Sequence, residues 1–171
     1  MEAELKKLRK RIEKEFAEKR RDVWFYPKRC KVKGWLGSKD VMFVGPNPSC
    51  NRFPTPQTNF FYDLLQRNKF ENAHLTDLIK IRATNNEADE IINKYFKNQI
   101  KILEEEINII KPKLIVIMGN RAKKAIERFN WKKRNLEYIY HYSLRFPRQK
   151  EKFIKNMKRI RKLIKIHERK N

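Results

Sequence analysis

The strongest limit on the fold comes from a continuous apolar run between Pro112 and Gly119, with the sequence Leu114-Ile115-Val116-Ile117-Met118. A run of this length is typical of a β-strand that is covered on both faces, as in a parallel sheet. A second short run, Val41–Val44, has the same character and ends directly at Gly45. Strands of this kind need helices on both faces of their sheet, so the sequence predicts an α/β fold.

Apolar residues recur at helical spacing in the segments around these runs. We expect helices over 1–21, from Asn59 onward, over Glu87–Ile110, after Gly119, and over about 149–168. The proline-rich segment Cys50–Thr58 is expected to be non-helical, with the next helix capped near Thr58 or Asn59. Two more strands are expected at Ala73–Ile79 and Tyr138–Tyr140. This alternation predicts a single three-layer α/β/α domain over residues 1–171, with a central, mostly parallel four-stranded sheet and basic terminal helices packed on it.

The chain is strongly basic, with 43 Lys and Arg against 20 Asp and Glu and a formal charge of +23. Such an excess favours an anionic partner, nucleic acid first and an acidic membrane surface second, although a basic surface can also serve solubility alone. No apolar run approaches the roughly 20 residues that span a bilayer, and the first residues contain no signal-peptide core. We therefore expect a monomeric cytoplasmic protein at the nucleoid. The richness in Lys, Glu and Ile is typical of thermophiles.

Cysteine usage gives no metal-binding pattern. Cys30 and Cys50 are the only cysteines and do not form a C-x-x-C pair, which excludes a four-cysteine cluster and most structural zinc sites. The sequence contains no H-E-x-x-H motif and no glycine-rich phosphate loop of the Walker type. It therefore predicts neither a metal nor another cofactor.

Polar residues follow three of the predicted strands, namely Asn47, Asp77 and His141. The carboxyl ends of parallel strands meet at one edge of a sheet, which is where open α/β sheets bind ligands. The loop Gly45–Ser49 should be rigid, because its two prolines fix two φ angles. The Asn47 amide could hold a water or a carbonyl there, whereas the other interpretation is a plain proline-rich turn.

Five short motifs follow one another between Lys39 and Pro147. They are Gly45-Pro46-Asn47-Pro48-Ser49, Asn59-Phe60-Phe61-Tyr62, Leu75-Thr76-Asp77-Leu78-Ile79, Lys111-Pro112-Lys113-Leu114 through Gly119, and His141-Tyr142-Ser143-Leu144-Arg145-Phe146-Pro147. In this order they resemble the motifs of the uracil-DNA glycosylase superfamily. The second and third are similar to the mismatch-specific branch. The last is similar to the H-P-S-P-R-N-P motif of the single-strand-selective branch, which it matches at His141, Ser143, Arg145 and Pro147, with Tyr142 in place of the first Pro.

The resemblance implies a uracil-DNA glycosylase-like fold and a DNA repair enzyme without a cofactor. Such a monofunctional glycosylase flips a deaminated or mismatched base, uracil first, out of DNA and hydrolyses its N-glycosidic bond. By resemblance, Asn47 would position the attacking water, and His141 would stabilise the leaving base. Gly45, Phe53 and Asp77 would contact the base, with Phe53 stacking on it and Asp77 reading its edge.

The resemblance also implies contacts to DNA from Ser49, Ser143 and Arg145. Arg145 would be the wedge that fills the gap left by the flipped base, whereas a surface phosphate contact is the alternative. Phe60 and Phe61 compete with Phe53 for stacking, although their place at a helix start favours core packing.

Other assignments also keep structural alternatives. His141 could be a histidine that is satisfied at a strand end, and Asp77 could cap a helix or pair with Lys80 or Arg82. At the level of the whole chain, one alternative is a glycosylase-like protein that binds nucleic acid without cutting it. Another is a nucleotide- or phosphate-binding module whose basic surface serves RNA.

Overall fold

The computed structural model describes residues 1–132, 135–143 and 147–169 of the 171-residue chain. Its centre is a sheet with the strand order β2-β1-β3-β4, formed by β1 (Val41–Gly45), β2 (His74–Asp77), β3 (Leu114–Met118) and β4 (Leu136–Ile139). Neighbouring strands pair in parallel throughout this sheet. The expected four-stranded, mostly parallel sheet is therefore confirmed.

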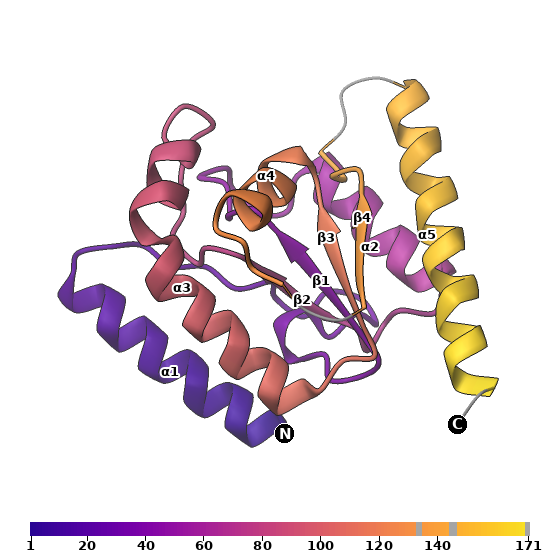
Figure 1. The fold of residues 1–171 in the computed structure, drawn as a ribbon, viewed down its shortest axis with the longest axis horizontal. Coiled ribbons are helices and arrows are strands. Elements are labelled where there is room, and N and C mark those ends of the chain that lie inside the picture. The colour runs from indigo at the N-terminus through magenta and orange to yellow at the C-terminus, as the bar shows by residue number, and fades with distance from the viewer. Residues whose placement is uncertain (133–134, 144–146, 170–171) are drawn as a thin grey trace.

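In the described residues, helices cover both faces of the sheet: α1 (Glu2–Glu18), the short 3-10 helix η1 (Gly34–Leu36), α2 (Pro56–Arg67), α3 (Ala88–Ile110), α4 (Asn120–Arg128) and α5 (Pro147–Arg169). The chain crosses from β1 to β2 through α2, and it returns across the sheet through α3 and α4. Because parallel crossovers are right-handed, α2 lies on one face, and α3 and α4 lie on the other. Figure 1 shows α1 alongside α3 and α5 alongside α2, which completes the three layers.

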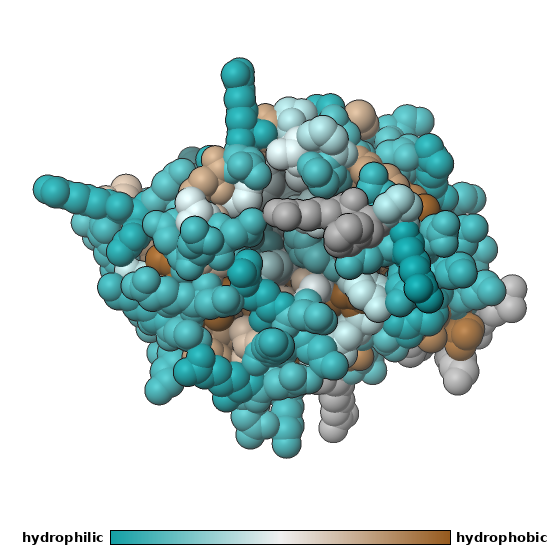
Figure 2. Space-filling view, turned by 90° about the horizontal axis from the view of Figure 1, so that it is seen from above, coloured by the Kyte–Doolittle hydropathy of each residue, from teal (hydrophilic) through white to brown (hydrophobic). Residues whose placement is uncertain are grey.

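Both basic terminal helices are attached to the core through an apolar stripe. The buried residues are Leu5, Leu8, Ile12 and Phe16 in α1, and Phe153, Met157, Ile160 and Ile164 in α5. They belong to the same hydrophobic core as the sheet. Lysines and arginines therefore occupy the outward faces, and Figure 2 shows a surface that is mostly hydrophilic when viewed from the top of Figure 1.

The start of α2 differs from the prediction, which was wrong for the last residues of Cys50–Thr58. The helix begins at Pro56, and Thr55 caps it. The Thr58 backbone N–H donates to Thr55 Oγ1 at 3.2 Å, and the Thr55 N–H donates to Thr58 Oγ1 at 2.8 Å. Pro56 does not prevent this, because the first turn of a helix has no intrahelical partner for its N–H groups. The reciprocal cap therefore outweighs the proline content of the segment.

The last strand and helix begin earlier than expected. β4 starts at Leu136 rather than Tyr138, and α5 starts at Pro147 rather than near residue 149. β4 is an edge strand with partly exposed side chains, so it lacks the continuous apolar pattern of β3. Within the described ranges, no helix combines the length and the hydrophobicity that a membrane span requires.

Candidate active site

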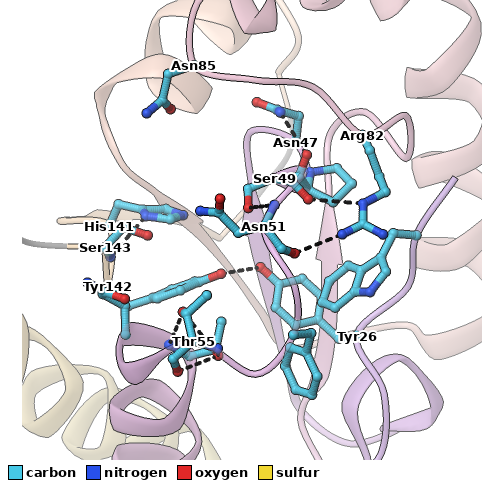
Figure 3. Close-up of a pocket in the computed structure, with 15 residues that line it drawn as sticks. Tyr26, Asn47, Ser49, Asn51, Thr55, Arg82, Asn85, His141, Tyr142 and Ser143 are labelled. Carbon is cyan, nitrogen blue, oxygen red and sulfur yellow. Dashed lines mark hydrogen bonds between the residues drawn. The ribbon is translucent and has the colours of Figure 1, made fainter. Parts of the chain in front are cut away.

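A cavity of about 300 Å³ opens at the carboxyl edge of the sheet (Figure 3). Asn47 reaches it from the loop after β1, Arg82 from the segment after β2, and His141 and Ser143 from the loop after β4. The volume is at the lower end of the range for small-ligand sites, so the cavity suits one ring system better than a larger molecule. The structure thus brings Asn47 and His141 together at one cavity.

The loop after β1 is pinned to the segment that follows β2. Arg82 donates from Nε to the Ser49 carbonyl at 3.1 Å and from Nη2 to the Asn51 carbonyl at 2.9 Å. The Ala83 N–H donates to the Pro48 carbonyl at 3.0 Å. Sequence reasoning considered Arg82 only as a partner of Asp77; here it fixes the loop that carries Asn47.

The side-chain amide of Asn47 forms a hydrogen bond through its nitrogen, while its oxygen is available to a ligand. Its Nδ2 donates to the Pro48 carbonyl at 3.1 Å. Within the described residues, no hydrogen bond reaches its Oδ1, which is an acceptor. The contact through Nδ2 orients the amide, so that a water at the cavity wall could donate to Oδ1.

His141 presents a defined tautomer on the cavity wall. The Ser143 backbone N–H donates to His141 Nδ1 at 3.1 Å, so a neutral imidazole carries its proton on Nε2. Burial of the ring and the nearby positive charge of Arg121 lower the pKa of His141 to about 4. At neutral pH the ring is therefore an uncharged donor, and Figure 3 shows it facing the cavity.

Gly119, at the end of β3, supports His141 from behind. A β-carbon at position 119 would lie 2.9 Å from the His141 Cβ, which is closer than such atoms pack. Gly119 also has a φ of +90°, a conformation that other residues rarely adopt. The glycine is therefore required both for the turn into α4 and for the position of His141.

Two tyrosines form the floor of the cavity. The hydroxyls of Tyr26 and Tyr142 lie 3.2 Å apart and share a hydrogen bond. The Tyr142 ring stacks on Phe61 with a centroid distance of 4.5 Å, and on His141 at 4.3 Å. Burial raises the pKa of both tyrosines well above the ordinary value. Both hydroxyls therefore stay protonated and give the floor a polar, uncharged character.

Asp77 and Gly45 lie behind this floor and do not line the cavity. Asp77 is fully buried, and burial raises its pKa to about 7, although the charge of Lys80 lowers it in part. A β-carbon at Gly45 would collide with Asp77 Oδ1 and would reach the Tyr26 hydroxyl at 3.5 Å. Gly45 therefore leaves room for the Asp77 carboxyl. The Nζ of Lys80 donates to the Asp77 backbone carbonyl at 2.6 Å.

The phenylalanines divide between the cavity and the core. Phe53 lines the cavity and is half-buried, with its ring 5.7 Å from that of Trp24. Phe61 is fully buried, and Phe60 packs on Phe153 at 6.3 Å. The expected core packing of Phe60 and Phe61 is confirmed, and Phe53 is the phenylalanine placed to meet a ligand.

The expected DNA contacts lie at the rim or outside the described residues. Ser49 and Ser143 are exposed at the mouth of the cavity. The Ser49 Oγ accepts from the Asn51 N–H at 3.0 Å, which tightens the loop. Arg145 lies outside the residues that the structure describes.

Several lining residues were missed from the sequence: Trp24, Tyr26, Asn51, Thr55, Gln57 and Asn85. Trp24 and Tyr26 belong to an irregular segment before the first strand, which carries no periodic signal. Asn85 follows β2 by eight residues, and that place beyond a strand end was the one available signal.

Metal binding finds no support in the described part of the chain. No group of three or more His, Cys, Asp or Glu side chains there is arranged to hold a metal ion. The polar groups at the cavity are amides, hydroxyls, one neutral imidazole, the Trp24 indole and the Arg82 guanidinium, which already donates to the Ser49 and Asn51 carbonyls. Such a site can orient a water and donate hydrogen bonds to a ligand that gains negative charge.

Comparison with known proteins identifies the family. No curated protein matches the chain. A family model described as the Uracil DNA glycosylase superfamily matches residues 35–165, which is more than half of the chain and includes every strand of the sheet. The chain therefore belongs to the uracil DNA glycosylase superfamily.

Proposed function

We propose that this protein is a monofunctional DNA glycosylase that removes a deaminated base, with uracil as the expected substrate. The observation that carries the proposal is the placing of Asn47 and the neutral His141 at one cavity of base size. Family membership supports base excision as the class of reaction. The formal charge of +23 supports DNA as the partner, since phosphate contacts release counterions.

The base must leave the helical stack to enter the cavity. There, Phe53 would stack on its face. Asn47 Oδ1 would accept a hydrogen bond from a water and direct it at C1′ of the deoxyribose. As the C1′–N bond breaks, its electron pair moves onto the base, and the Nε2–H of His141 would stabilise the negative charge at the base O2. The water oxygen then bonds to C1′ and releases its proton to solvent.

The proposal of a monofunctional enzyme also has support from the cavity. An enzyme that also cleaves the DNA backbone commonly forms a Schiff base through an amine. Among the described residues, no lysine lines this cavity. Water is therefore the proposed nucleophile.

Asp77 would act on the base from behind the floor. We propose that it affects base selection through Tyr26, because its carboxyl lies beside the Tyr26 hydroxyl. Gly45 would act on base selection indirectly, because it leaves room for the Asp77 carboxyl and the Tyr26 hydroxyl.

Ser49 and Ser143 would contact phosphates at the rim, and Arg145 is proposed as the wedge in the duplex. We further propose a monomer in the cytoplasm, at the nucleoid; a thermophilic source stays a prediction from composition.

The test is base release from oligonucleotides that carry uracil, a thymine mismatch, hypoxanthine or xanthine. Alkali converts each abasic product into a strand break that a gel resolves. We expect cleavage of the uracil substrate under single-turnover conditions. DNA binding without release of any of these bases would contradict the proposal and favour the non-catalytic alternative.

The protonation state of His141 gives a first prediction. Its pKa is lowered to about 4, so the ring should stay neutral from pH 8 down to about pH 5. Nitrogen NMR of protein labelled in its histidines should show a proton on Nε2 over this range. The signal that disappears in a His141→Gln variant is the signal of His141. Titration of His141 near pH 6.5, or a proton on Nδ1, would contradict the proposed role.

The support of His141 by Gly119 gives a second prediction. Gly119→Ala should slow base excision by about tenfold or more, because the new methyl group displaces the His141 ring and its donor. Single-turnover rates at saturating enzyme measure this effect. Lys124→Ala is the control, because Lys124 is exposed on α4, the helix that begins directly after Gly119; this variant should excise normally. Equal rates for the two variants would show that Gly119 does not position His141.

A further inference from the structure

Two exposed aromatic side chains lie close together at the carboxyl end of β4. Among the described residues, the large hydrophobic side chains that are exposed are Met1, Tyr138, Tyr140 and Ile166. Tyr138 is 36% exposed and Tyr140 is 41% exposed. Tyr138 lies in β4 and Tyr140 directly follows its last residue, Ile139, which is buried between them. Both tyrosines line the same groove, as expected for side chains two residues apart in extended chain. The proposed function uses neither tyrosine.

These tyrosines border a second cavity next to the first. This groove has a volume of about 290 Å³ and is lined by β4 with Gly119, Asn120 and Lys123 of the α4 region and Asn156 of α5. Gly119 lines the groove and packs against His141, which lines the active-site cavity. The two cavities therefore adjoin through the contact of Gly119 with His141, and Tyr140 directly precedes His141 in the chain.

Cationic side chains lie over both rings. The Lys123 Nζ is 5.5 Å from the Tyr138 ring centroid, and the Lys152 Nζ is 5.5 Å from that of Tyr140. Lys123 also contacts Glu127 at 3.7 Å, which offsets part of its charge. No carboxylate lines the described groove itself. Surfaces that bind single-stranded nucleic acid combine aromatic rings, which stack on bases, with ammonium groups, which contact phosphates.

The spacing of the tyrosines distinguishes an unpaired strand from a duplex. Residues two apart on a β-strand are separated by about 7 Å along it. Consecutive bases in a duplex strand are held about 3.4 Å apart. Two aromatic rings at about twice that spacing can interleave with bases only when the strand is free to stretch. The geometry therefore favours unpaired nucleotides on this surface.

We propose that Tyr138 and Tyr140 form a stacking platform for the unpaired bases that flank the flipped base, so that the preferred substrate is single-stranded DNA. This inference rests on the proposed function for the identity of the flipped base. Lys123 and Lys152 would contact the phosphates between the stacked nucleotides. The strand would then run from the platform past His141 into the active-site cavity.

The experiment measures binding of an undamaged single strand that carries 2-aminopurine, and of the matching duplex, at one fixed salt concentration. Replacing both tyrosines by alanine should weaken single-strand binding by about 25-fold or more, since each of the two stacked bases contributes at least about fivefold. Duplex binding should change by less than about threefold. Tyr138→Phe with Tyr140→Phe should restore single-strand binding, because the rings remain.

Tyr95→Ala is the matched control. Tyr95 is a half-buried tyrosine of α3 that also has cationic side chains near its ring, from Arg21 and Lys94. It lies on another element, so this variant should bind the single strand normally. Circular dichroism checks that all variants are folded.

Three outcomes decide between the inference and the proposed function. Normal single-strand binding by the double alanine variant would overturn the platform, even if the wild type excises uracil. An equal loss on single strand and duplex would overturn the assignment to unpaired bases. If the wild type excises no base but single-strand binding depends on the two rings, the platform stands and the proposed catalytic function fails.

Discussion

Replacement of Asn47 by alanine should slow base excision by about two orders of magnitude or more. Loss of one preorganised polar group at a reacting centre has this scale. The amide is oriented by its contact with the Pro48 carbonyl, and alanine would leave the attacking water without its acceptor. Single-turnover rates at saturating enzyme on uracil-containing DNA measure the effect. Binding of undamaged DNA should change little, because no phosphate contact is removed.

Asn86→Ala provides the control for this variant. Asn86 is exposed in the segment before α3 and does not line the cavity. We expect it to excise uracil at the rate of the wild type. If Asn47→Ala also excised at nearly that rate, Asn47 would have no part in the reaction.

Replacement of Glu106 by glutamine should lower the free energy of unfolding by about 3–5 kcal/mol. Glu106 is fully buried in α3, where its Oε1 is 2.8 Å from the Lys80 Nζ and its Oε2 is 3.1 Å from His74 Nε2. Burial alone would raise the pKa of Glu106, but the charge of Lys80 and the contact with His74 bring it down to about 2. The amide would leave a buried ammonium without its counter-charge.

Urea unfolding at pH 7 measures this loss. Glu105→Gln is the control, because Glu105 lies next in the same helix but forms an exposed ion pair with Arg11 at 2.7 Å. Exposed pairs contribute about 1 kcal/mol or less. The Glu106 contribution should also disappear in the wild type as the pH falls from about 4.5 to about 2, since the unfolded carboxyl then binds a proton first. Equal losses in the two variants would show that the buried pair does not stabilise the fold.

The fold could be predicted from sequence wherever one local signal dominated. The apolar run Leu114–Met118 became β3 without a change of boundary, because a strand buried on both faces has no competing pattern. The start of α2 was misplaced, since the reciprocal bonds of Thr55 and Thr58 cannot be seen in proline content. The prediction for β4 began too late, at Tyr138 instead of Leu136, because an edge strand mixes buried and exposed residues.

The candidate site was predictable only where its residues follow the ends of strands. Asn47 and His141 follow strand ends, and topology alone brings such residues to one edge. Tyr26 could not be found this way, because it comes from an irregular segment and reaches the cavity through a long-range contact with Tyr142. The position of Asp77 behind the floor depends on side-chain direction, which strand order does not determine.

The anchoring of the loop after β1 by Arg82 has a consequence for the entropy of substrate binding. A flexible loop loses conformational freedom when a ligand orders it, and that loss weakens the affinity. Here, two hydrogen bonds from Arg82 and one from Ala83 hold the loop before any base arrives. The ordering is already complete when the protein folds. Differences in affinity between bases should therefore arise from the cavity itself rather than from how well each base can organise the loop.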